Sequence, residues 1–172
     1  MKSFMIKLMM ILSCYGLIFF ACINPCSAQG SAGTFGLGIK DTIAAEEAFI
    51  VVGRFWVSDM VTIDGNFGFK YIDVENDKDN DYKRFLLGVG INQYLLSPQK
   101  FRPFVGLDFL IRVDDPRKGE SDTTGELDGK VGGEYFLADR FSLSGEVLLR
   151  LRFGDEDEFG TGGRLGVIYY LN

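Results

Sequence analysis

Apolar and polar residues alternate with period two along eight stretches of the chain. In the clearest stretch, 141–153, Leu149 and Leu151 alternate with Arg150 and Arg152. Successive side chains of a β-strand point to opposite faces, so each stretch has one apolar face and one polar face. The predicted strands are 34–40, 47–57, 61–73, 83–96, 101–113, 126–137, 141–153 and 163–171. With no helical pattern between them, they predict an all-β protein, an eight-stranded antiparallel up-and-down barrel.

The connections between the predicted strands alternate between short and long. The short ones are 58–60, 97–100 and 138–140. The long ones, mostly charged, are 41–46, 74–82, 114–125 and 154–162. Short turns at one rim and longer loops at the other are typical of barrels in the bacterial outer membrane, where the turns face the periplasm. The alternation therefore favours a transmembrane barrel.

The two faces of the strands indicate which side of the barrel meets lipid. One face collects Phe, Leu, Val, Ile and Tyr residues, and the other collects the charged residues. The interior of an eight-stranded barrel is only just wide enough for side chains, so this many large apolar groups would overfill it. We therefore expect the apolar face outside, against lipid. The alternative is a soluble, ligand-filled barrel of the lipocalin type.

The charged face then lines the lumen, where opposite charges are expected to pair and plug the barrel. The predicted lumen network is Arg54, Asp64, Lys70, Asp108, Arg112, Lys130, Glu134, Glu146, Arg150 and Arg152. Within it, the four arginines are expected to pair with Asp64, Asp108, Glu134 and Glu146. A catalytic carboxylate pair, such as Asp108 with Glu134 or Glu146, is the less favoured interpretation because basic residues are at least as numerous in the lumen.

The first 28 residues have the pattern of a secretory signal peptide. A charged start with Lys2 and Lys7 is followed by an apolar run from Leu8 to Ile23 and a small-residue exit, with cleavage predicted after Ala28. The predicted domains are a signal peptide over 1–28 and an outer-membrane barrel over 29–172. Lipidation of Cys22 is the alternative, although the residue pattern before this cysteine departs from that of lipoproteins.

The composition argues against several classes of function. All three cysteines lie in 1–28, so the exported domain is predicted to be free of disulfides. Removing 1–28 also leaves 16 basic and 24 acidic residues, a balance that argues against a nucleic-acid partner. The chain has no His, so a His-based nucleophile, metal site or general base is excluded. We expect no enzyme activity, no cofactor and no metal, and interpret the acidic clusters 75–81 and 155–158 as solvated loops.

The last predicted strand carries the most specific local motif. Arg164 is followed by Gly166, and then by Tyr169 and Leu171 at a spacing of two. With this ending, the chain resembles the small outer-membrane β-barrels of Gram-negative bacteria, of the OmpA membrane-domain and OmpX type within the porin family. In that family the final strand is an insertion signal read by the barrel-assembly machinery. This chain departs in its last residue, Asn172, where a terminal Phe is common.

The resemblance implies residence in the outer membrane, with the lipid bilayer and lipopolysaccharide as surroundings. The expected function is a structural role in envelope integrity, with the lumen plugged by charges. Two alternatives stay open from the sequence. One is an adhesin or binding protein that contacts an extracellular ligand through loops 74–82, 114–125 and 154–162. The other is a narrow conduit for small molecules.

Overall fold

The structure is a computed structural model that describes residues 30–43, 49–72, 82–96, 99–116, 121–154 and 157–171. It contains eight strands: β1 (Phe35–Thr42), β2 (Phe49–Ser58), β3 (Val61–Ile72), β4 (Tyr82–Tyr94), β5 (Phe101–Pro116), β6 (Asp122–Ala138), β7 (Phe141–Phe153) and β8 (Glu158–Tyr170). The predicted signal peptide, Cys22 and most of loop 74–82 lie outside the described residues. Nothing in the described ranges forms a helix long and apolar enough to cross a bilayer.

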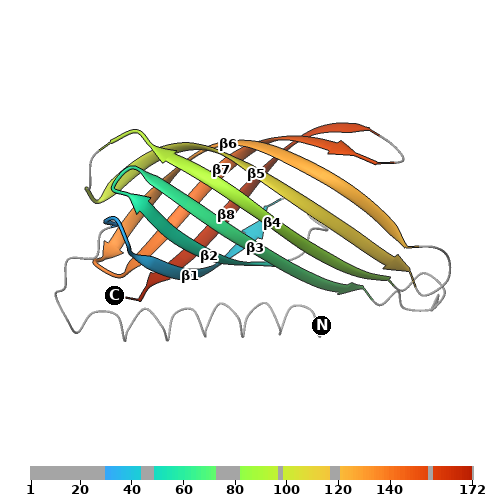
Figure 1. Cartoon of the computed structure of the whole chain (residues 1–172), viewed down its shortest axis with the longest axis horizontal. Helices are drawn as coiled ribbons and strands as arrows, with labels where there is room; N and C mark the ends of the chain where they lie inside the picture. The colour runs from blue at the N-terminus through green and yellow to red at the C-terminus, as the bar shows by residue number, and fades with distance from the viewer. Residues whose placement is uncertain are drawn as a thin grey trace.

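Each strand pairs antiparallel with its neighbours in the sequence, and β1 also pairs with β8 to close the barrel. Figure 1 shows the strands tilted around the barrel, with both the segment before β1 and the end of β8 at the rim that carries the short turns. The predicted fold class, a closed eight-stranded antiparallel barrel, is confirmed. We call the rim with Asp59–Met60 and Asp139–Arg140 the turn end, and the opposite rim the loop end.

The strands extend further at the loop end than the alternation predicts. β8 begins at Glu158 rather than at 163, because Gly160 and Gly162 pair with Arg150 and Leu148 of β7. β5 and β6 likewise stay paired as far as Asp114 and Asp122. The apolar pattern stops earlier than the pairing because backbone hydrogen bonds do not require an apolar face. The predicted loops 114–125 and 154–162 are therefore too long.

The expected alternation of short and long connections is correspondingly only partly right. The β2–β3 and β6–β7 turns are tight, and each is preceded by a bulge, at Trp56/Ser58 and at Phe136/Ala138. The β4–β5 connection, however, covers 95–100 and is longer than the β5–β6 connection, 117–121. The longest connection between strands, 73–81 between β3 and β4, does lie at the loop end, so the expected asymmetry holds for some connections and not for others.

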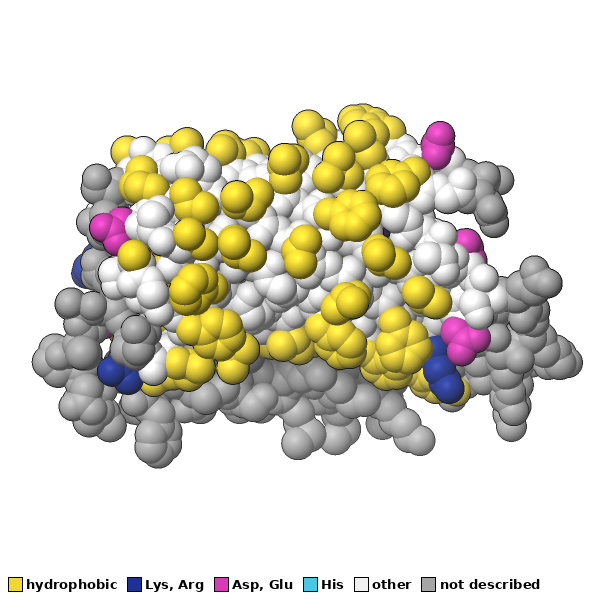
Figure 2. Space-filling view, in the orientation of Figure 1, with side chains coloured by type: hydrophobic (Ala, Val, Ile, Leu, Met, Phe, Trp, Pro, Cys, Tyr) yellow, Lys and Arg dark blue, Asp and Glu magenta, His cyan; other side chains and the backbone are white. Residues whose placement is uncertain are grey.

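Every strand contributes exposed large apolar residues to the outer wall, and on the face seen in Figure 2 they cover the barrel between its two rims. On β7 the exposed fraction follows the predicted period: Val147 and Leu149 are 60% and 56% exposed, while Leu148 is 0% exposed. Arg150, the next residue along β7, is buried. The large apolar groups therefore face outward and the charged groups face the lumen, as the pattern predicts. Phe141 shares the outward face with its register partner Tyr169 but is itself buried.

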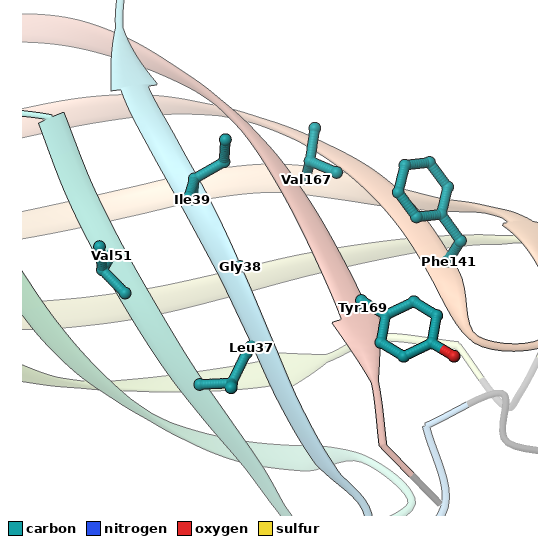
Figure 3. A pocket seen from close by; sticks show the side chains of 7 residues that line it. All are labelled: Leu37, Gly38, Ile39, Val51, Phe141, Val167 and Tyr169. Atoms are coloured by element: carbon teal, nitrogen blue, oxygen red, sulfur yellow. The ribbon is translucent and has the colours of Figure 1, made fainter. Parts of the chain in front are cut away.

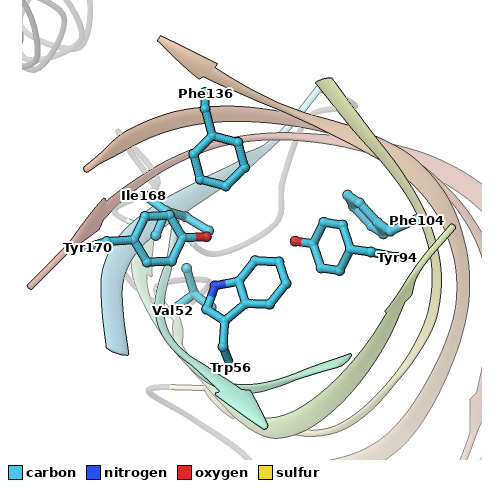
Figure 4. Packing of buried hydrophobic residues seen from close by; sticks show 7 residues of the cluster. All are labelled: Val52, Trp56, Tyr94, Phe104, Phe136, Ile168 and Tyr170. Carbon is cyan, nitrogen blue, oxygen red and sulfur yellow. The ribbon is translucent and has the colours of Figure 1, made fainter. Parts of the chain in front are cut away.

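The lumen near the turn end holds an aromatic layer that the alternation of apolar and polar residues does not predict. Its members are Val52, Trp56, Tyr94, Phe104, Phe136, Ile168 and Tyr170, all buried. Figure 4 shows these side chains converging from several strands on the interior of the barrel. The Trp56 and Tyr94 rings lie 4.6 Å apart, and Phe136 stacks on Tyr170 at 5.7 Å. This layer occupies the lumen just inside the turn end.

Glycines on the lumen face make room for charged side chains. A Cβ on Gly90 would lie 1.9 Å from Oδ1 of Asp108, and one on Gly106 would lie 2.7 Å from Cε of Lys130. The salt bridge between Asp108 and Lys130 thus occupies space that two missing side chains leave free. On the outer face, by contrast, a Cβ on Gly65 would have only a backbone oxygen 3.9 Å away.

Candidate functional site

The candidate site is the lumen itself, and its turn-end half is organised around Glu134 of β6. Both carboxylate oxygens of Glu134 are occupied. Oε2 accepts hydrogen bonds from Arg54 Nη1, at 2.9 Å, and from the Tyr94 hydroxyl. Oε1 accepts hydrogen bonds from the Tyr170 hydroxyl, at 2.7 Å, and from the Ser142 hydroxyl. All five residues are buried. A buried carboxylate with this many donors is fully compensated for the loss of water.

Arg54 links this group to the middle of the lumen. Its guanidinium forms a two-point contact with Asp64, from Nε to Oδ1 at 2.8 Å and from Nη2 to Oδ2 at 2.7 Å. Asp64 also accepts from the Asn92 amide at 3.1 Å and from Lys40 Nζ at 3.4 Å. Two-point arginine–carboxylate pairs have a fixed geometry, so this contact restrains β2 against β3 as well as neutralising charge.

Arg164 of β8 is the corresponding hub in the middle of the lumen. Its Nη1 lies 2.9 Å from Asp108 Oδ2 and 3.4 Å from Glu146 Oε1, and its Nη2 contacts Asp128. Asp108 is further neutralised by Lys130, whose Nζ lies 2.5 Å from Oδ1. Lys40 reaches Glu146 at 3.5 Å and so connects this group to Asp64. Four acids and three bases are thereby joined across β1, β3, β5, β6, β7 and β8.

Toward the loop end the network continues through β6, β7 and β8. Arg150 Nε lies 2.8 Å from Glu126 and 2.9 Å from Asp128. Arg152 pairs with Glu126 at 3.0 Å and with Glu158 at 2.8 Å, where the side chain of Glu158 is 62% exposed. The ion pairs therefore run without a break from the aromatic layer to the solvent at the loop end. Along this path each described carboxylate contacts at least one cation.

The structure changes several of the predicted pairs. Arg54 does contact Asp64 and Glu134, as expected. Arg112 instead lies 3.5 Å from Asp114, an acid two residues away on its own strand. Arg150 and Arg152 contact acids of β6 and β8 rather than any of the four predicted partners. Those expected pairs are wrong because each arginine finds an acid nearby: Asp128 lies opposite Arg150 and Glu126 opposite Arg152 in the register of β6 and β7, and Asp114 lies two residues from Arg112 on β5.

The remaining predicted lumen residues lie at the edges of this network. Arg112 is half-buried near the loop end. There Asp114 also forms an ion pair with Arg84, whose Nε lies 2.6 Å from Asp114 Oδ1. Lys70, also half-buried, lies opposite Arg84 in the register of β3 and β4. These residues belong to the outer mouth of the lumen and not to its sealed centre.

Five charged residues of the lumen are missing from the predicted network. They are Lys40, Arg102, Glu126, Asp128 and Arg164. Glu126 and Asp128 alternate in phase with Lys130, and Arg102 alternates in phase with Asp108. Lys40 and Arg164 have the opposite parity to the outward-facing Leu37 and Leu165 on their strands. Strict use of the two-residue period would have found them.

The C-terminal motif is distributed over both faces of β8. Arg164 and Gly166 point into the barrel, where a Cβ on Gly166 would lie 2.6 Å from the Ser144 hydroxyl. Tyr169 and Leu171 point outward and are 39% and 51% exposed. The motif therefore places its polar and small members in the lumen and its large members on the outer wall.

A separate apolar hollow lies on the outer wall over β1 and β8. It encloses about 320 Å³ and is lined by Leu37, Gly38, Ile39, Val51, Phe141, Val167 and Tyr169. Figure 3 shows the labelled side chains standing on neighbouring strands around it. The lining contains no charged group, so the hollow offers apolar contact and no polar recognition.

Comparisons with known proteins agree with this architecture. No protein-family model matches the sequence, and a search of curated proteins finds no match. Among solved structures, the chain is similar to the N-terminal β-barrel domain of Pseudomonas aeruginosa OprF, with a TM-score of 0.57 and 15% identity over 81% of this chain and 98% of that one. Ail of Yersinia pestis also matches, with a TM-score of 0.44 and 14% identity over 80% of this chain and 94% of that one. The chain thus has the β-barrel fold seen in the OprF domain.

Proposed function

We propose that the protein is an integral outer-membrane β-barrel with a structural role in the cell envelope, and that its lumen is closed to ions and solutes. The observation that carries the proposal is the pairing of an apolar outer wall with a lumen whose charges compensate one another. An apolar wall this extensive is costly in water and favourable in lipid. Each buried carboxylate of the described lumen lies within 4.0 Å of a cation, which replaces part of the solvation that water would provide.

The edges of the outer wall support a membrane position. Tyr71 and Phe85 are exposed near the loop end, and Tyr135 and Tyr169 are exposed near the turn end. Aromatic residues at both borders of an apolar band are characteristic of transmembrane barrels. Just beyond the loop-end border, the exposed charges of Lys83 and Asp115 lie opposite each other on β4 and β5. Aromatic residues therefore border the apolar band at both ends, which supports a membrane position.

The lumen supports a structural role over a conduit. The aromatic layer occupies the turn end, and the ion pairs from Arg54 to Arg152 run through the rest of the lumen. A second buried apolar cluster of Ile50, Leu86 and Leu110 also contributes side chains to the lumen. Water-filled channels in barrels of this type need a larger circumference, roughly 16 strands. At the loop end, the connections 117–121 and 154–157 are short, which leaves little loop surface on those two hairpins for an adhesin.

Expression of the full chain in a Gram-negative host tests this proposal. We expect the protein in the outer-membrane fraction, with an electrophoretic mobility that changes on heating because the barrel stays folded in detergent until it is boiled. The purified, folded barrel is expected to give no conductance steps of porin size in planar bilayers. A water-filled porin measured in the same bilayers is the positive control.

Two outcomes contradict the proposal, and each contradicts a different part of it. Recovery of the native protein from the soluble periplasmic fraction would refute the membrane location and favour the lipocalin-like alternative. Porin-size conductance from a correctly folded barrel would refute the closed lumen and favour the conduit.

A further inference from the structure

The segment before β1, residues 30–34, folds back across the turn end of the barrel. The Gly33 amide donates to the Trp56 carbonyl at 2.8 Å, and the Trp56 amide donates to the Thr34 carbonyl at 2.9 Å. The Ala32 amide donates to Asp59 Oδ1 at 3.0 Å, which ties the segment to the β2–β3 turn. Gly33 and Thr34 together face Trp56, so the two bonds with Trp56 extend the β1–β2 pairing by one bulged position, and residues 30–32 continue beyond it across the turn end.

At the tip of this segment, Gly30 enters the mouth of the lumen. It is buried, and its φ of 60° lies in the left-handed region that favours glycine. A Cβ at this position would lie 2.3 Å from the Trp56 ring and 2.8 Å from Arg102 Nη1. Both the backbone conformation and the available space therefore require glycine here.

Gly30 contacts the Arg102 side chain, which lies against the aromatic layer. Its guanidinium carbon is 4.4 Å from the centre of the Trp56 ring and 4.6 Å from that of Tyr94. Stacking of a buried guanidinium on aromatic faces is favourable. Arg102 Nη1 donates to the Gly30 carbonyl at 3.2 Å, and Nη2 donates to the Asp59 carbonyl. One buried cation thus joins the segment, a turn and the aromatic layer.

We propose that residues 30–34 form a cap that docks on Trp56 and Arg102 and closes the mouth of the lumen at the turn end. The cap is held by a few hydrogen bonds and by the fit of Gly30 against Trp56, so it is able to detach while the barrel wall stays intact. Detachment exposes the aromatic layer to water. The inference rests on contacts of the described residues and not on the membrane location, so it and the proposed function can fail separately.

The test uses Trp56, the single tryptophan of the chain, as an internal probe. The variant Gly30→Leu places a side chain where the Trp56 ring lies and is expected to release the cap. The matched control, Ala32→Leu, adds similar bulk to an exposed position of the same segment. Quenching of Trp56 emission by acrylamide is measured for both variants, folded in detergent micelles, with heat-modifiable mobility to establish folding. We expect quenching to rise several-fold in Gly30→Leu and to match the parent in Ala32→Leu.

Three results would overturn the cap. One is a folded Gly30→Leu barrel whose Trp56 is as protected as in the parent. Another is an equal rise in quenching for Ala32→Leu. The third is loss of folding in both Gly30→Leu and the milder Gly30→Ala, because the segment would then belong to the folding core and would not be a detachable cap.

Discussion

Replacing Glu134 with alanine is expected to destabilise the barrel more than any other single loss of a lumen carboxylate. The substitution removes the acceptor of Arg54, Tyr94, Ser142 and Tyr170 together. Breaking a buried pair by removing one partner costs about 3–5 kcal/mol, because the other group stays buried without compensation. Arg54 retains its ion pair with Asp64, but the hydroxyl groups of Tyr94, Ser142 and Tyr170 lose the acceptor of their hydrogen bonds.

The measurement is equilibrium unfolding in urea of the barrel in lipid vesicles, followed by Trp56 emission. Glu158→Ala is the matched control, because Glu158 also accepts from an arginine but is largely exposed. Exposed pairs contribute about 0–1 kcal/mol, so we expect a small change in the free energy of unfolding for this variant. Equal stability of Glu134→Ala and the parent would mean that water, and not the network, solvates the turn-end half of the lumen.

Replacing Leu149 with arginine is expected to have the second largest effect, on insertion into the membrane. Leu149 lies mid-strand on the outer wall and is more than half exposed. Arginine on the lipid face costs about 2–4 kcal/mol at the bilayer midplane and about 0–1 kcal/mol near the interface. Phe159→Arg is the depth-matched control on the same face, because Phe159 is the second residue of β8 and lies near the loop end.

The readout is the folded fraction on refolding into vesicles, seen as the heat-modifiable band, together with the free energy of unfolding. We expect Leu149→Arg to fold in lower yield and with lower stability than Phe159→Arg. If both variants fold as well as the parent, the outer wall does not contact the hydrocarbon core of a bilayer.

The fold could be predicted closely because alternating residues of a strand point to opposite faces, so the polarity pattern shows directly which residues face outward. On β7 the residues from Val147 to Arg150 alternate in exposure as their polarity predicts. Strand ends at the loop end could not be predicted in the same way. Beyond the apolar band the outer face no longer needs large apolar groups, so Thr123 and Thr124 in β6 and Gly160 in β8 show no alternation of polarity although they are paired.

The lumen residues could largely be predicted, but their partners could not. The position of a residue in the two-residue period decides whether its side chain faces the lumen. Its ion-pair partner depends instead on the tilt of the strands and on the stagger between them. Arg54 of β2 reaches Glu134 of β6 across the barrel, a contact that no local spacing encodes. The aromatic layer was missed for a related reason. Trp56, Tyr94 and Tyr170 lie on lumen-face positions near strand ends, where aromatic residues are usually interpreted as facing the interface.

The most direct test of the membrane-embedded barrel uses single cysteines at 147, 148, 149 and 150. Residues 29–172 contain no cysteine, so each substitution gives one labelling site. A fluorophore attached to each cysteine is examined in vesicles that contain lipids with a nitroxide on the acyl chain. We predict strong quenching at 147 and 149 and weak quenching at 148 and 150, because only the first two side chains face outward. Equal quenching at all four sites, or the opposite alternation, would contradict an apolar wall in contact with lipid around a closed, charged lumen.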